Sequence, residues 1–182
     1  VNALPIVAML GFLFGLILAF QSAVPLKYYG ADLFVPNLVA LSLLREMGPL
    51  ITAIVLAGRS GSAFAAELGT MKINEEIDAL RTLGLDPVRF LVTARVLAAV
   101  LVMPPLSVFA NFFGLAGAAL VMGSFGFPLV TFCNQVMSAA RTGDLLGGLF
   151  KSLVFGLLVG AVGCLRGLQT GAGASAVGDS TT

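Results

Sequence analysis

The chain has 182 residues; 58% of them are hydrophobic, 10% are charged and none is histidine. Because a soluble domain carries about a quarter charged residues, this composition predicts a multi-pass membrane protein. The net charge of +1 does not suggest a nucleic-acid partner, and the lack of histidine removes the commonest general base and the commonest metal ligand. We expect no catalytic site, no metal site and no cofactor, and we expect Cys133 and Cys164 to be packing residues.

Four segments are apolar enough to cross a bilayer, which takes about 20 residues each. They lie at roughly 3–25, 34–57, 91–122 and 145–165. The third is too long for one plain span, so Pro104 and Pro105 are expected to kink or divide it. The stretch "FPLVTFCNQVMSAARTGD" predicts a shorter helix that lies at the interface or returns on the outer side. The fold class is therefore an all-α membrane protein, with one transmembrane domain over 1–182.

Basic residues in the connections predict the orientation of these spans. The first connection contains Lys27 and the third contains Arg141. The second contains five basic residues: Arg59, Lys72, Arg81, Arg89 and Arg95. Because Lys and Arg concentrate on the cytoplasmic side, we expect the loop 58–95 to be cytoplasmic and the first span to start inside the cell.

The stretch "KINEEIDALRTLGLDP" in this loop predicts a short helix. Asn74 is a suitable N-cap, and acidic residues in the first turn complement the positive end of the helix. Gly84 suits the position after the last turn, and Pro87 prevents continuation. The acidic residues are Glu75, Glu76 and Asp78, and the apolar stripe is Ile77, Leu80 and Leu83. Such a helix is marginal alone, so it either packs on its own bundle or presents its stripe and acidic rim to a cytoplasmic partner.

Two opposite charges and a helix breaker interrupt the second span in "LLREMGPL". Arg45 and Glu46 point about 100° apart on a helix, so they cannot simply neutralise each other. Pro49 lacks an N–H and leaves the carbonyl of Arg45 without its helical partner. Lys151 in the fourth span is the best candidate to approach Glu46. The pair either locks the packing of the helices or provides a polar point in a substrate path.

Small residues recur at four-residue spacing, which lets helices approach closely in membranes. Gly11 and Gly15 form one such pair, and the fourth span contains Ser152, Gly156, Gly160 and nearby Gly163. They predict a tightly packed bundle or a homodimer. The run "GRSGS" lacks the spacing and the lysine of a phosphate-binding loop, so we expect no nucleotide hydrolysis by this chain.

The stretch "LVALSLLREMGPLITAIVLAGRSGSAFAAELGTMKINEEIDALRTLGLDPVRFLVTARVLA" resembles the MlaE (YrbE) family of ABC-transporter permeases, and the match runs from about 38 to 105. Its ELGP-like turn, AGRxGSAxxAELG-like run, EQIDAL-like helix and DP turn form a specific combination. Weaker similarity continues through "KSLVFG" and the tail "GASAVGDSTT". The family has an amphipathic helix before this region and a fifth membrane helix after it, so the resemblance implies that both ends belong to a longer protein.

The resemblance implies a homodimeric permease of the bacterial inner membrane, bound to cytoplasmic ABC ATPase subunits and to periplasmic MCE-domain subunits. The implied cargo is phospholipid, moved between the inner membrane and the cell envelope in a system of outer-membrane lipid asymmetry. ATP hydrolysis is assigned to the partner. The family's coupling helix falls on 74–83, within a coupling loop over 67–90, and its polar residues fall on Arg45, Glu46 and Lys151.

The implied mechanism has two copies that enclose an apolar cavity, with acyl chains against Leu16, Phe20 and Leu41. Arg45, Glu46 and Lys151 lie near the headgroup or hold the gating helix. The ATPase acts through Glu75, Glu76, Ile77, Asp78, Leu80 and Leu83. Two alternatives remain open: an ion-coupled secondary transporter that uses the Arg45–Glu46 pair, and a membrane scaffold whose acidic helix only recruits proteins.

Overall fold

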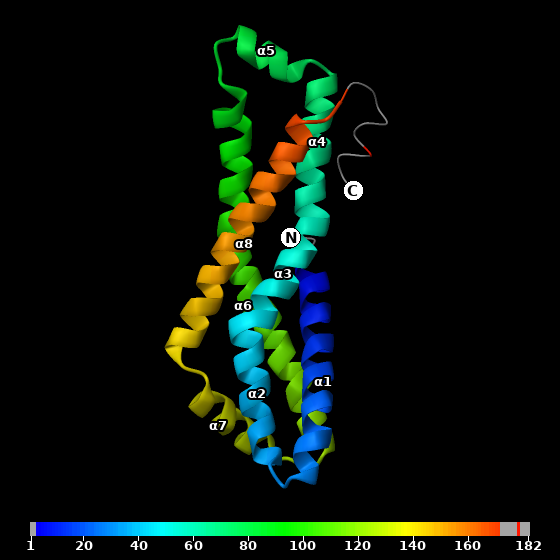
Figure 1. Ribbon diagram of the computed structural model, residues 1–182, viewed down its shortest axis with the longest axis vertical. Helices are drawn as coiled ribbons and strands as arrows, with labels where there is room; N and C mark the ends of the chain where they lie inside the picture. The colour runs from blue at the N-terminus through cyan, green and yellow to red at the C-terminus, as the bar shows by residue number, and fades with distance from the viewer. Residues whose placement is uncertain (1–2, 172–177, 179–182) are drawn as a thin grey trace. The chain divides into compact units, whose positions relative to one another are not determined.

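The computed structural model describes residues 3–171 and residue 178 (Figure 1). The described part of the chain is helical and contains no strand, which confirms the all-α prediction. Within the described residues, four helical stretches are long and apolar enough to cross a membrane: Leu4–Tyr28, Asp32–Ile73, Val88–Ser124 and Thr142–Leu168. The tail "GASAVGDSTT", which contributed to the family resemblance, lies outside the described residues except for Gly178.

The helices follow one another with few loop residues between them. The first half of the chain contains α1 (Leu4–Tyr28), η1 (Asp32–Phe34), α2 (Val35–Ser42), η2 (Leu43–Met47), α3 (Gly48–Leu56), η3 (Ala57–Gly61) and α4 (Ser62–Ile73). The second half contains α5 (Glu76–Thr82), η4 (Val88–Val92), α6 (Thr93–Ser124), α7 (Leu129–Ala139) and α8 (Thr142–Leu168). η1 is a 3₁₀ turn, and η2, η3 and η4 are π-helical turns.

The chain forms two compact units. The first comprises residues 1–52 and 104–152, and the second comprises residues 53–103 and 153–182. The core of the first unit is a cluster of buried apolar side chains from α1, α2, η2, α6 and α7. Its members are Ala19, Ala23, Val35, Val39, Leu43, Ala118, Val121, Met122 and Phe132.

Glycines bring the backbones of α1 and α6 into direct contact in the first unit. A Cβ atom built on Gly15 would lie 1.8 Å from the carbonyl oxygen of Gly114, and one on Gly11 would lie 2.5 Å from that of Ala110. Both glycines are buried, so this contact surface is filled within the chain. The four-residue spacing of Gly11 and Gly15 therefore packs one chain and does not by itself indicate a dimer.

The helix α6 continues through Pro104 and Pro105 from Thr93 to Ser124. The two prolines therefore do not divide the third span, and a kink at them stays a prediction. Proline removes one backbone donor, but neighbouring protein and local adjustment let membrane helices tolerate that loss. Beside the prolines Leu106 and Ser107 are buried, whereas Pro105 and Val108 are exposed, so this stretch of the helix packs on protein along one face.

In the second unit, glycines of α8 contact α6 and η3. A Cβ atom on Gly156 would lie 3.0 Å from the carbonyl oxygen of Ala99, and one on Gly163 would lie 2.7 Å from that of Gly61. The ion pair between Arg95 and Glu67, with 3.1 Å between nitrogen and oxygen, joins α6 to α4. The small residues of the predicted fourth span thus also pack within the chain.

Lys72 at the end of α4 caps the C-terminus of α8. Its Nζ donates hydrogen bonds to the carbonyl oxygens of Leu168 at 2.8 Å and Thr170 at 2.7 Å. The last carbonyls of a helix lack intrahelical partners and carry partial negative charge. A cation at this position satisfies both needs and fixes the end of α8 to α4.

Replacing Lys72 with methionine is expected to lower the stability of the second unit by about 1 kcal/mol, because two carbonyls lose a charged donor. Hydrogen exchange measured by mass spectrometry should accelerate over residues 164–170. Arg89→Met is the matched control, since it removes one positive charge from an exposed side chain of the same unit. Equal exchange in both variants would contradict the capping role.

The predicted cytoplasmic helix is present as α5, but its N-cap is not Asn74. The helix α4 extends to Ile73 and ends on Asn74, whose N–H bonds to the carbonyl of Thr70. Glu75 then takes the N-cap position with φ of 59°, a left-handed conformation that is uncommon outside glycine. The helix begins one residue later than predicted because α4 runs further than its apolar composition suggested.

The other end of α5 matches the prediction. Gly84 has φ of +75°, a conformation that costs glycine little. Its N–H bonds to the carbonyl of Arg81, and the N–H of Leu85 bonds to that of Leu80. These two bonds form the Schellman motif, which satisfies the last carbonyls of the helix.

The predicted apolar stripe of α5 is divided between the protein and its surroundings. Ile77 is 4% exposed, Leu80 is half-buried and Leu83 is 75% exposed. The helix therefore docks on its own chain through Ile77 and presents Leu83 outward. Packing on its own bundle is thus confirmed for Ile77, and a cytoplasmic partner for the exposed end stays a prediction.

The predicted helix between the third and fourth spans is α7. At 11 residues it is too short to span. Phe132 inserts into the core of the first unit and is 3% exposed, whereas Val130 and Met137 are 73% and 80% exposed. α7 is therefore anchored by one aromatic side chain and carries an outward apolar face, as expected of a helix at an interface.

Candidate functional site

The break in the second span is a π-helical turn, and the sequence explains it. Pro49 cannot donate to the carbonyl of Arg45, which would be its partner in a regular helix. The N–H of Gly48 instead bonds to the carbonyl of Leu43, five residues back. The expected interruption is thus a local widening of the helix, a feature that often marks functional sites.

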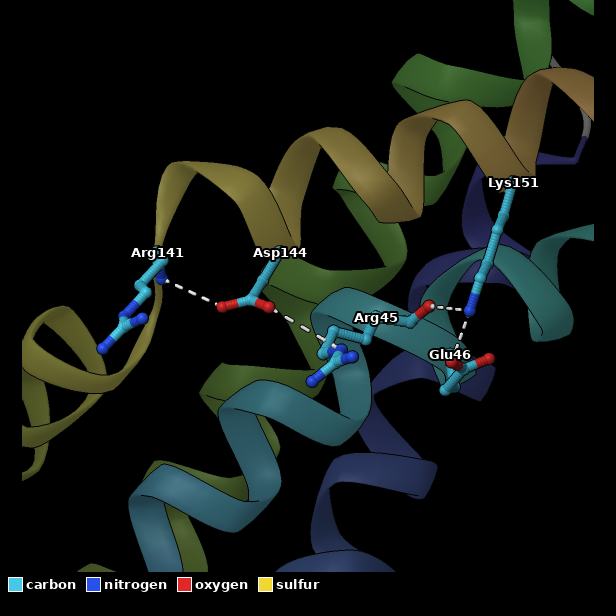
Figure 2. A network of polar contacts seen from close by, with 5 residues as sticks. All are labelled: Arg45, Glu46, Arg141, Asp144 and Lys151. Carbon is cyan, nitrogen blue, oxygen red and sulfur yellow. Dashed lines mark hydrogen bonds and ion pairs between the residues drawn. The ribbon is translucent and has the colours of Figure 1, made fainter.

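Lys151 of α8 completes this turn. Its Nζ donates to the free carbonyl of Arg45 at 3.3 Å and forms an ion pair with the carboxylate of Glu46. The predicted approach of Lys151 to Glu46 is confirmed. One side chain therefore satisfies the acceptor that Pro49 leaves open and balances the charge beside it (Figure 2).

Asp144 is the fourth charged member of the site, and the sequence analysis did not identify it. Its Oδ1 lies 3.6 Å from Nε of Arg45, and its Oδ2 accepts a hydrogen bond from the backbone N–H of Arg141 at 3.3 Å. Figure 2 shows the carboxylate between Arg141 and Arg45. Asp144 and Lys151 are seven residues apart, so both face the π-helical turn from one side of α8. This seven-residue spacing from Lys151 is the sequence signal that could have identified Asp144 as a member of the site.

Each charge of the Arg45–Glu46 pair is thus matched by a residue of α8. Arg45 pairs with Asp144, and Glu46 pairs with Lys151. This agrees with the expectation that neighbouring residues on a helix do not neutralise each other. We name Arg45, Glu46, Asp144 and Lys151 the charged cluster.

A small hollow opens beside the charged cluster. It has a volume of about 140 Å³ and is lined by Arg45, Gly143, Asp144, Gly147, Gly148 and Lys151. A Cβ atom on Gly143 or Gly147 would meet nothing within 4 Å, so these two glycines leave the hollow open, whereas one on Gly148 would lie 2.1 Å from the carbonyl oxygen of Leu44. Sites that enclose whole drug-sized ligands occupy roughly 300–1,000 Å³, so this hollow accommodates only a polar fragment of a larger molecule.

Asn111 of α6 packs against the same break. A Cβ atom at Gly48 would lie 1.9 Å from its Oδ1, so this close approach requires glycine at position 48. Asn111 is 5% exposed, and its Oδ1 has no hydrogen-bond partner in the described part of the chain. The hydroxyl of Thr52 bonds back to the carbonyl of Gly48 at 2.7 Å, which keeps that carbonyl satisfied inside α3.

The apolar residues predicted to contact acyl chains lie elsewhere in the first unit. Leu16 is half-buried against the core, and Leu41 of α2 is also half-buried. Phe20 is 54% exposed and packs edge to face on Phe125, with 5.6 Å between ring centroids. None of the three lines the hollow at Arg45. The predicted coupling residues belong to the second unit and lie on and beside α5.

The whole chain, residues 1–182, matches the family Permease MlaE. A probable ABC transporter permease protein of Synechocystis is 43% identical over 169 residues, which cover 92% of this chain and 64% of that protein. A probable ABC transporter permease protein of Rickettsia typhi is 37% identical over 182 residues, with 100% and 70% covered. The intermembrane phospholipid transport system permease protein MlaE of Haemophilus influenzae is 34% identical over 184 residues, again with 100% and 70% covered.

The chain therefore spans 64% to 70% of the length of these three relatives. The match over every residue agrees with the four candidate membrane spans of the structure. The chain is a multi-pass membrane protein that belongs to the MlaE family of permeases.

Proposed function

We propose that the chain is the permease subunit of an ABC transporter that moves phospholipid between the inner membrane and the cell envelope. The observation that carries this proposal is the match of the whole chain to the MlaE permease family. The Haemophilus influenzae relative is named as a permease of an intermembrane phospholipid transport system. ATP hydrolysis belongs to a cytoplasmic ATPase subunit, and periplasmic MCE-domain subunits receive or deliver the lipid.

The charged cluster supports this proposal as the polar point of a lipid path. Arg45 and Lys151 border the hollow of about 140 Å³, which suits a phosphate-containing headgroup and leaves the acyl chains outside it. Cations bind phosphate through charge-assisted hydrogen bonds. A charge in a membrane span costs roughly 2.5–3.5 kcal/mol, so a cluster of four charges at this position indicates function.

We further propose that two copies enclose the acyl chains, as the family resemblance implies. Apolar side chains of α1 and α2 line the path, with Leu16, Phe20 and Leu41 among them. Phe20 is more than half exposed in the single chain, so it is available to lipid or to the second copy. The small-residue pairs are filled within the chain, so the dimer contact must use other surfaces.

The proposed contact with the ATPase is α5 and the turn after it, on the cytoplasmic side of the inner membrane. Ile77 is buried and holds the helix on its own chain, while Leu83 is 75% exposed and is free to enter a groove of the partner. The ion pair between Asp78 and Arg81, 2.9 Å long, lies on the exposed surface of α5. Glu75 and Glu76 add an acidic rim, which suits a basic border on the partner groove.

Leu83→Asp is expected to reduce recovery of the ATPase subunit with the tagged full-length permease at least tenfold, because a charge replaces the apolar anchor at the centre of the contact. The amount of ATPase that co-purifies from membranes measures this directly. Ala94→Asp is the control, since Ala94 is also exposed and lies outside the coupling loop 67–90. Undiminished recovery with Leu83→Asp would place the contact elsewhere.

Native mass spectrometry of the full-length permease, expressed with its ATPase and extracted gently, tests the assembly. A mass equal to two permeases plus two ATPase subunits, with adducts of phospholipid size, is expected. A single permease without ATPase or lipid would contradict the proposal and would favour an ion-coupled transporter that uses Arg45 and Glu46.

A further inference from the structure

We propose that Asp144 is an internal competitor for the anionic headgroup: its carboxylate holds Arg45 when the hollow is empty and yields Arg45 to a phosphate when lipid enters. The inference rests on the proposed function and assigns a role to a residue outside the set implied by the family resemblance. It also gives different roles to the two cations of the charged cluster, Arg45 and Lys151.

Lys151 is committed to the fold of the π-helical turn. It bonds to the carbonyl of Arg45 and pairs with Glu46. Moving it to a ligand would leave an unsatisfied carbonyl and an unpaired carboxylate within a membrane span, and both are costly. Lys151 is therefore a positioning residue that holds the break in the helix.

Arg45 is held much more loosely. Its Nε lies 3.6 Å from Oδ1 of Asp144, which makes an ion pair but is too far for a hydrogen bond. The side chain of Arg45 is 60% exposed. The pair of Lys151 and Glu46 includes a hydrogen bond and this one does not, so the contact of Arg45 with Asp144 is the weaker of the two and exchanges more readily. A guanidinium offers five donors and can grip a phosphate through two parallel hydrogen bonds. The geometry favours Arg45 as the residue that meets the headgroup.

Asp144 is fixed in place, as a competitor must be. Only 19% of its side chain is exposed. It lies in the first turn of α8 and accepts a hydrogen bond from the N–H of Arg141, the arrangement in which an acid stabilises a helix N-terminus. When Arg45 leaves, this backbone donor still satisfies the carboxylate. Asp144 can therefore release Arg45 while one of its oxygens, Oδ2, keeps a hydrogen-bond donor.

The consequence is a site that is neutral when empty and discriminates by charge when occupied. The cluster contains two cations and two carboxylates, so the empty site has no net charge to attract ions non-specifically. A ligand must bring its own anionic group to replace Asp144 on Arg45. The carboxylate lowers affinity for every anion and thereby keeps the lipid exchangeable, as transport requires.

Asp144→Asn is expected to tighten binding of dioctanoyl phosphatidylglycerol to the full-length permease by roughly two- to fivefold, the equivalent of losing one weak ion pair. The amide oxygen still accepts the hydrogen bond from Arg141, so the start of α8 is retained. Titration followed by native mass spectrometry gives the dissociation constants. Asp32→Asn is the control, because Asp32 is an acid of the same unit that does not line this hollow.

The decisive comparison repeats Asp144→Asn in an Arg45→Gln background. If Asp144 acts through Arg45, the gain disappears in the double variant, since the two effects are coupled. An equal gain in both backgrounds, or no gain in either, would overturn the proposal. If wild-type permease binds phosphatidylglycerol and Asp144→Asn changes its affinity in neither background, the proposed function stands but the competing role of Asp144 is refuted.

Two further titrations identify the source of the phosphate. Dioctanoylglycerol has the same acyl chains without a phosphate, and it is expected to bind equally to wild type and Asp144→Asn. Inorganic phosphate that displaces the lipid only from Arg45-containing variants would support the exchange and assign free phosphate as a second ligand. Wild-type binding of dioctanoylglycerol as tight as that of phosphatidylglycerol would contradict headgroup recognition, and with it this part of the proposed function.

Discussion

Replacing Lys151 with methionine is expected to reduce ATP-driven phospholipid transfer at least tenfold. The change leaves the Glu46 carboxylate unpaired in a membrane span, at a cost of roughly 2.5–3.5 kcal/mol. It also leaves the carbonyl of Arg45 without the donor that replaces the missing N–H of Pro49. The π-helical turn should therefore rearrange, and Arg45 should lose its position beside the hollow. Transfer of a fluorescent phospholipid between proteoliposomes measures the effect.

A second variant separates loss of the site from loss of the fold. Glu46→Gln combined with Lys151→Met removes both charges, so it should recover thermal stability close to that of wild type. Transfer should remain low, because the turn still lacks its donor. Wild-type transfer by Lys151→Met would show that the charged cluster is dispensable. Recovery of transfer in the double variant would show that Glu46 and Lys151 only stabilise helix packing.

Gly15→Ala is expected to be the most damaging substitution for the fold of the first unit. The added Cβ would lie 1.8 Å from the carbonyl oxygen of Gly114 and 2.8 Å from its Cα. Both neighbours are backbone, so no flexible side chain can move aside, and α1 and α6 must separate. Overpacking costs 1–3 kcal/mol and occasionally more, and we expect about 3 kcal/mol here.

The yield of monodisperse protein and the midpoint of thermal unfolding in detergent measure this loss. Gly123→Ala is the matched control, because it adds the same methyl group to α6 where nothing lies within 4 Å. It should be neutral or slightly stabilising, since alanine favours the helix by up to about 1 kcal/mol over glycine. Similar midpoints for the two variants would contradict the close contact of α1 and α6.

The number and position of the membrane helices could be predicted because twenty apolar residues in sequence are a local signal. The full extent of the second helical stretch was not predicted. It continues to Ile73 through Glu67 and Lys72, whose polarity suggested a loop. Partners distant in the sequence, Arg95 and the end of α8, stabilise that extension, and such contacts leave no trace in local hydropathy.

The sequence predicted three of the four members of the charged cluster, because long-range contacts are not visible in local sequence patterns. Arg45, Glu46 and Pro49 are conspicuous in an apolar run, and Lys151 was the best candidate in another span to approach Glu46. Asp144 lies at the start of α8, where an acid is also explained by the helix dipole, so its second contact with Arg45 was not evident. Its spacing of seven residues from Lys151 acquires meaning only once α8 is known to face the π-helical turn.

The most direct test of the account is transfer of fluorescent phospholipid by the full-length permease with its ATPase and MCE-domain partners in proteoliposomes. The account predicts transfer that requires ATP, stops with Leu83→Asp and falls at least tenfold with Lys151→Met. Proton and sodium gradients should have no effect. Transfer driven by such a gradient without the ATPase would contradict the account and would assign Arg45 and Glu46 to ion coupling.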